Sequence, residues 1–260
     1  MIPYFLFGFI AAYLMMAAMV FVLQSRLIYP VPATQTGVPP GFERVTYRAS
    51  DGFELEAGFA PPHEGRQTIV FFHGNGADWK TSANVTNRIR KQGFGVLAAE
   101  YRGYGGNPGS PSEQGLYADG RGALQFLADR GIADKDIVLV GNSIGSGVAV
   151  QMATEHDVRS VVLVSPFASL AETAARKMPW LPVRTLLRER YDNLSKIGRL
   201  EMPVLILHGE DDRLIKPDQA QALAAAQPRA RLVMYEEWGH GLVVAQDVQQ
   251  RIMIFVDDFS

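Results

Sequence analysis

The stretch from Asp136 to Val150 constrains the fold of this chain more than any other. Ile137 to Val140 is a short, wholly apolar run rich in β-branched residues, as expected of a strand buried on both faces of a sheet. Residues 141–145 read Gly-Asn-Ser-Ile-Gly, a G-x-S-x-G pentapeptide, and small and apolar residues suited to a closely packed helix follow them. Strand, tight turn and helix in this order predict a nucleophile elbow with Ser143 at its tip.

Strand-like and helix-like runs alternate along the rest of the chain, which predicts an α/β fold with a mostly parallel sheet and helices on both faces. We expect eight strands in one domain from residue 27 to residue 260. The first two strands are joined at Asp51-Gly52, which is a hairpin signal. The region of about 166–202 is helical, less apolar and interrupted by Pro179 and Pro182, so we expect it to form a small helical lid inserted into the domain.

The N-terminal segment is unlike the rest of the chain. Ile2 to Leu23 has no charged residue, and a helix of this length spans about 33 Å, against about 30 Å of bilayer hydrocarbon. A cleaved signal peptide is the competing interpretation, but no basic residue precedes the long apolar core. We expect an N-terminal transmembrane helix as a single-pass anchor at residues 1–26, with the lipid bilayer as the partner of residues 2–23. Arg26 alone follows the span, and this weak positive-inside bias favours a cytoplasmic domain.

Composition narrows the classes of function. Of 260 residues 47% are hydrophobic and 20% charged, the formal net charge is −2, and no basic patch is interleaved with aromatics, so no nucleic-acid partner is expected. The chain has no cysteine, which excludes disulfides, thiolate nucleophiles and zinc–thiolate sites. The acidic run 210–212 has no histidine or further carboxylate at metal-ligand spacing, and we expect neither a metal nor a cofactor. The sequence leaves the oligomeric state open.

A serine hydroxyl becomes a good nucleophile only when a base takes its proton and an acid orients that base. In a sheet of this kind the acid and the base follow the serine in that order, on loops at the carboxyl ends of later strands. His240 alone among five histidines follows the last predicted strand, which makes it the expected base. Asp212 follows the preceding strand, but the residues alone leave its neighbours Glu210 and Asp211 open as the acid.

An oxyanion hole needs two backbone N–H groups that face the developing alkoxide. One is expected from Ile144, directly after the nucleophile. The other is expected from the loop after the strand at 68–72, with Asn75 as first choice and Gly76 next. His73, at the start of this loop, is interpreted as a residue whose ring nitrogens satisfy backbone groups at the strand end.

Seven stretches, spread in order over most of the chain after the anchor, carry a family resemblance: FFHGNGA (71–77), EYRGYGGNPGSPSEQGLYAD (100–119), GNSIGSGVA (141–149), SPFASLAETA (165–174), LPVRTLLRERYDNLSKI (181–197), PVLILHGEDDRLIKP (203–217) and GH (239–240). The chain resembles the α/β-hydrolase superfamily, and several stretches resemble its Bem46/ABHD13-like branch of membrane-anchored serine hydrolases. The resemblance implies an α/β-hydrolase fold with an N-terminal membrane segment, and it assigns the acid to Asp212. The sequence departs from the usual family pattern at Glu100, where aspartate is common, and at Asn142, Ser146 and Gly241-Leu242.

The expected activity is acyl transfer to water by Ser143, His240 and Asp212 through an acyl-enzyme. Anchor and lid favour esters of acyl lipids, of the monoacylglycerol or lysophospholipid type, with acyl-protein or acyl-CoA thioesters as the alternative. A non-catalytic, membrane-tethered binding protein of the same fold is the alternative from another class, since fold does not imply function. The apolar lid residues equally fit a role in packing the lid onto the domain. The residues expected to contact substrate are Gly76, Tyr104, Met178, Trp180 and Leu242.

Overall fold

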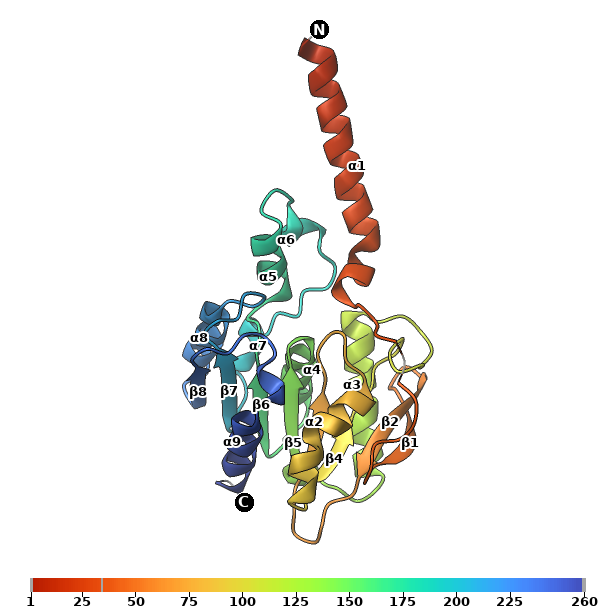
Figure 1. Ribbon diagram of the computed structural model, residues 1–260, viewed down its shortest axis with the longest axis vertical. Helices are drawn as coiled ribbons and strands as arrows, with labels where there is room; N and C mark the ends of the chain where they lie inside the picture. Colours follow the sequence, from red (N-terminus) through yellow and green to blue (C-terminus); the bar gives the residue numbers. More distant parts are fainter. Residues whose placement is uncertain (1, 34, 259–260) are drawn as a thin grey trace.

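A computed structural model describes residues 2–33 and 35–258, and its centre is one eight-stranded sheet in the order β1-β2-β4-β3-β5-β6-β7-β8 (Figure 1). β1 and β2 form an antiparallel hairpin, β2 is antiparallel to β4, and the later pairings are parallel. The predicted mostly parallel, eight-stranded sheet is confirmed. The strands are β1 (Glu43–Arg48), β2 (Glu54–Ala60), β3 (Thr68–Phe72), β4 (Gly95–Ala98), β5 (Ile137–Asn142), β6 (Ser160–Val164), β7 (Val204–Gly209) and β8 (Ala230–Tyr235).

Helices cover both faces of the sheet, which explains why the central strands are apolar along their whole length. Ile89 of α2 and Phe255 of α9 pack in the core on one face. Leu124 of α3, Val148 of α4 and Leu223 of α8 pack in the core on the other. These helices are α2 (Trp79–Lys91), α3 (Glu113–Ala128), α4 (Ile144–Glu155), α8 (Pro217–Ala226) and α9 (Gln246–Asp257), with the short helices η1 (Asp134–Asp136) and η2 (Leu242–Val244) between elements.

The region 166–202 divides into two parts. α5 and α6 stand away from the sheet, beside the lower part of α1 (Figure 1). α7 instead packs against α4 and α8, and its Ile197 is fully buried in the main core. In the region 166–202, which we continue to call the lid after the prediction, the projecting part is formed by α5 and α6 with their connections. These helices are α5 (Leu170–Lys177), α6 (Val183–Leu186) and α7 (Leu194–Ile197).

α1 (Ile2–Ile28) is the one helix in the described part of the chain that is long and apolar enough to cross a membrane. Its 27 residues are about 40 Å long, more than the hydrocarbon thickness of a bilayer. The helix stands out from the domain at the lid end (Figure 1). A signal sequence at this position would have the same length and composition, so the membrane anchor stays a prediction.

The lower half of α1 packs against the lid along one helical stripe. Tyr13, Ala17 and Val20 of this stripe contact the cluster that includes Leu181 and Leu187 of the lid. Their spacing of three to four residues places them on one face of the helix. The lid is therefore supported by α1 as well as by the domain.

Candidate active site

Ser143 lies at the tip of a sharp turn between β5 and α4. Its backbone has φ 52° and ψ −117°, which costs a residue with a Cβ about 1–3 kcal/mol. The turn packs directly on the end of β3, because a Cβ added to Gly145 would lie 2.1 Å from the carbonyl oxygen of Phe72. The backbone N–H of Ser143 donates to the carbonyl oxygen of Val164 on β6, at 3.0 Å. Strand, turn and helix are thus arranged as the pentapeptide predicts.

The side chains of Ser143, His240 and Asp212 form one hydrogen-bonded chain. His240 Nε2 is 3.0 Å from Ser143 Oγ, and His240 Nδ1 is 2.8 Å from Asp212 Oδ2. A carboxylate only accepts hydrogen bonds, so Nδ1 carries the hydrogen and Nε2 is free to accept from the serine hydroxyl. The arrangement suits proton transfer from serine to histidine.

Asp212 is held by the backbone as well as by His240. Its Oδ1 accepts from the N–H groups of Leu214 and Ile215, at 2.8 and 2.9 Å. Burial acts to raise the pKa of the Asp212 carboxyl, but the hydrogen bonds from His240 and the backbone outweigh it and hold the pKa below its ordinary value. The carboxyl is therefore ionised at neutral pH. The neighbours Glu210 and Asp211 are exposed.

His208 supports the loop that carries the acid. Its ring is fully buried, and Nε2–H donates to the carbonyl oxygen of Ile215 at 2.9 Å. Burial lowers the pKa of His208, so the ring is neutral at neutral pH. The same nitrogen is 3.6 Å from Asp212 Oδ2, which places the ring behind the acid.

The loop after β3 packs against the turn that carries Ser143. This loop contains Asn75 and Gly76, which are predicted oxyanion donors. A Cβ added to Gly74 would lie 3.2 Å from Ser143 Cβ, so the absence of a side chain permits this close approach. Asn75 and Gly76 follow at once, and both are exposed. Ile144 is the first residue of α4, where a backbone N–H has no acceptor within the helix. Nucleophile and predicted donors therefore share one corner of the sheet.

The residues predicted to contact substrate lie in different places. Tyr104 is buried, with its hydroxyl 3.5 Å from Asn75 Oδ1 at the oxyanion loop. Met178 is half-buried and packs against the lid cluster that α1 also contacts, and Trp180 of the lid has an exposed side chain. Leu242 is fully buried in the core beside α9, so its placement gives no support for substrate contact.

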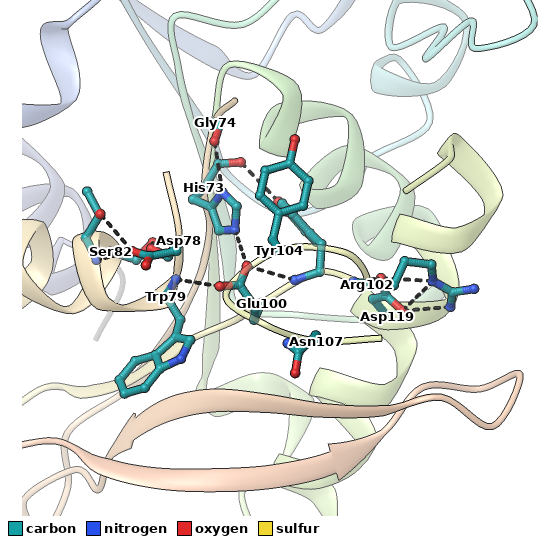
Figure 2. Close-up of polar contacts among 12 residues, drawn as sticks. His73, Gly74, Asp78, Trp79, Ser82, Glu100, Arg102, Tyr104, Asn107 and Asp119 are labelled. Carbon is teal, nitrogen blue, oxygen red and sulfur yellow. Dashed lines mark hydrogen bonds and ion pairs between the residues drawn. The ribbon is translucent and has the colours of Figure 1, made fainter. Parts of the chain in front are cut away.

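His73 makes a contact that the sequence did not reveal. One ring nitrogen meets a backbone group, as expected: Nδ1 is 2.8 Å from the carbonyl oxygen of Gly74. Nε2 instead lies 2.6 Å from Oε1 of Glu100, at the end of the neighbouring strand (Figure 2). The available signal was a carboxylate directly after β4, paired with a histidine directly after β3.

Within residues 2–33 and 35–258, no group of three or more histidine and acidic side chains is placed to hold a metal ion.

Sequence comparison identifies the family. A family model described as serine aminopeptidase, S33, matches residues 63–195, and one described as alpha/beta hydrolase fold matches residues 185–244. An uncharacterized protein of Mycobacterium tuberculosis, Rv2307c, is 37% identical over 227 residues, which cover 84% of this chain and 80% of that protein. The chain belongs to the α/β-hydrolase superfamily, which places it among hydrolases.

Solved structures share the architecture. An esterase of Pyrococcus furiosus aligns with a TM-score of 0.72 at 19% identity, covering 88% of this chain and 97% of the esterase. A membrane phospholipase A, described as a bacterial virulence factor, aligns with a TM-score of 0.65 at 18% identity. The alignment covers 99% of this chain and 97% of the phospholipase. Likeness at these identities confirms the α/β-hydrolase fold. Membership of the Bem46/ABHD13-like branch stays a prediction.

Proposed function

We propose that this chain is a membrane-anchored serine hydrolase that cleaves carboxylic esters of acyl lipids. The observation that carries the proposal is the hydrogen-bonded chain from Ser143 through His240 to Asp212. A strained serine at an elbow, a histidine free to accept its proton and a buried carboxylate behind that histidine are the parts that acyl transfer requires.

The reaction proceeds in two halves. Ser143 Oγ bonds to the ester carbonyl carbon as His240 Nε2 takes the hydroxyl proton, and Asp212 stabilises the imidazolium. The N–H groups of Ile144 and Asn75 donate to the oxyanion, each contributing about 3–4 kcal/mol to transition-state stabilisation. His240 returns the proton to the departing alcohol, which leaves an acyl-enzyme. Water, deprotonated by His240, then releases the acid and restores the serine.

The position of α1 supports a lipid substrate. Ser143, Asp212 and His240 follow the carboxyl ends of β5, β7 and β8. α1 stands at this end of the sheet (Figure 1). Asn75 Nδ2 donates to the carbonyl oxygen of Ile28, the last residue of α1, at 2.5 Å. If α1 spans a bilayer, an ester at the membrane surface reaches the serine without leaving the headgroup region. The exposed Trp180 on the lid suits this interface.

An acyl chain-length series tests the substrate class. We expect kcat/KM for monoacylglycerol esters to rise at least tenfold from acetyl to medium and long chains, because the longer chains bury more apolar surface. The full-length chain in lipid nanodiscs is the enzyme, and Ser143→Ala provides the blank. Preference for the acetyl ester would contradict the proposal.

The same assay separates the other substrate classes. A palmitoyl-CoA thioester of matched chain length tests the thioesterase alternative. An aminoacyl nitroanilide tests peptidase activity, because one matching family model is described as a serine aminopeptidase. We expect the ester to be cleaved fastest, and a higher kcat/KM for either other substrate would reassign the activity.

A further inference from the structure

His73 sits in a buried polar cluster directly behind the oxyanion loop. Its ring lies between the carbonyl oxygen of Gly74 and the carboxylate of Glu100 (Figure 2). Both His73 and Glu100 have 1% or less of their side-chain surface exposed. The hydrolytic mechanism uses neither side chain, although a buried ionisable pair is costly to maintain.

The hydrogen-bond partners define where the protons are. The Gly74 carbonyl can only accept, so His73 Nδ1 carries a hydrogen and donates it. Nε2 and Glu100 Oε1 share the second proton, whether as imidazolium and carboxylate or as imidazole and carboxylic acid. Nδ1–H is present in both cases, and the bond to Gly74 is therefore maintained.

The bond from His73 acts on a catalytic group through the peptide plane. The Gly74 carbonyl and the Asn75 N–H belong to the same planar unit and point in opposite directions. A flip of this peptide changes ψ of Gly74 and φ of Asn75, and Gly74 has no Cβ to restrict the first of these rotations. Holding the Gly74 oxygen therefore holds the direction of the Asn75 N–H.

We propose that His73 and Glu100 are positioning residues, which lock the Gly74–Asn75 peptide so that its N–H faces the oxyanion. This inference rests on the proposed function, because it assigns a task within the same acyl-transfer site. Glu100 fixes the orientation of the His73 ring, and His73 fixes the orientation of the Gly74–Asn75 peptide. Neither touches the substrate.

The surroundings of Glu100 keep this pair in place. Its Oε2 accepts from the backbone N–H of Trp79 at 2.8 Å, and its Oε1 also accepts from that of Tyr101 at 3.0 Å. The Tyr101 hydroxyl donates to the backbone carbonyl of His73 at 3.1 Å. Next along the chain, Arg102 is paired with Asp119 at 2.7 Å and fastens the loop to α3 (Figure 2). Hydrogen bonds and this ion pair thus connect the His73–Glu100 pair and its loop to β3, β4, α2 and α3.

Two substitutions at His73 separate positioning from packing. His73→Leu removes the donor to Gly74. His73→Asn keeps one, because the asparagine Nδ2 is as many bonds from Cα as the histidine Nδ1. For a soluble short-chain ester we expect His73→Leu to lower kcat by about 10²–10³-fold, the cost of losing one oxyanion donor, with KM within about threefold of wild type. His73→Asn should recover at least tenfold of that loss.

Three further readouts complete the experiment on the full-length chain in nanodiscs. The affinity of a boronic acid, which forms a tetrahedral adduct with serine, should fall in parallel with kcat in His73→Leu. The pH–rate profile should keep its wild-type shape. In ¹⁵N-histidine NMR spectra of the wild type, His73 Nδ1 should carry a directly bonded hydrogen, and this measurement does not depend on any variant folding.

The outcomes distinguish the inference from the function on which it rests. Wild-type kcat in a folded His73→Leu, equal losses in His73→Leu and His73→Asn, or an unprotonated Nδ1 would each overturn the positioning role while the triad stands. Equal ester hydrolysis by wild type and Ser143→Ala would instead remove the proposed function itself.

Discussion

Asp212 has two oxygens with two separate tasks, and a single substitution tests both. Oδ1 accepts from two backbone N–H groups, so the oxygen of Asp212→Asn remains there and its NH₂ turns toward His240. His240 Nδ1 must then accept, which moves the ring hydrogen to Nε2 and prevents Nε2 from taking the Ser143 proton. We expect kcat for ester hydrolysis to fall by about 10³–10⁴-fold. Undiminished activity would transfer the role of the acid to Glu210 or Asp211.

The pH dependence of stability is the control for this variant. The pKa of Asp212 is held below its ordinary value in the folded chain, so the unfolded chain binds the proton more tightly. The contribution of the ionised carboxyl is therefore present above about pH 4 and is lost as pH falls through the folded-state pKa. The difference in free energy of unfolding between wild type and Asp212→Asn should shrink below about pH 4, measured by denaturant titration.

The hydrogen-bonded arrangement of Ser143, His240 and Asp212 was predictable because each residue has a distinctive place along the chain. Ser143 lies between a strand and a helix, and His240 alone among the histidines follows the last strand. The contact between His73 and Glu100 was not predictable, because it depends on which strands are neighbours. β3 and β4 are adjacent, but β5 rather than β2 lies on the other side of β3, and no local pattern sets that order.

At the scale of elements, α1 and the lid depend on each other. Gln24 marks the end of the apolar run in the sequence, yet its side chain is buried against the lid. Its Oε1 accepts from the N–H of Arg188 at 2.8 Å, and its Nε2 donates to the carbonyl oxygen of Leu186 at 3.5 Å. The helix was predictable from its apolar length, but this interface required knowing where the lid returns to the domain.

Gln24→Ala tests this interface. The substitution leaves the N–H of Arg188 and the carbonyl oxygen of Leu186 without their Gln24 partner. This destabilises the packing of the lid on α1 by about 1–3 kcal/mol. We expect trypsin to cleave after Arg184 and Arg188 several-fold faster than in wild type. Leu27→Ala, on the exposed side of the same helix, is the matched control and should leave the cleavage rate unchanged. Equal rates in all three proteins would show that Gln24 does not hold the lid.

At the scale of the whole molecule, a membrane-anchored hydrolase requires that α1 is retained in the mature protein. A signal peptide would be removed, and the lid would then lose the stripe of contacts from Tyr13 to Ile28. We expect the intact mass of the membrane-extracted protein to include this segment. An intact mass that corresponds to a chain starting near residue 26, together with release of the protein from the membrane by a carbonate wash, would exclude the anchor.

The central claim is that Ser143 is the activated nucleophile of a hydrolase, and covalent labelling tests it most directly. A fluorophosphonate probe reacts with a serine only when a base activates it and an oxyanion hole receives the phosphoryl oxygen. Mass spectrometry of the labelled protein should locate one adduct on Ser143, absent from Ser143→Ala and at least tenfold slower to form in His240→Ala. Equal labelling of wild type and Ser143→Ala, or labelling of neither, would contradict the account and favour a binding protein of the same fold.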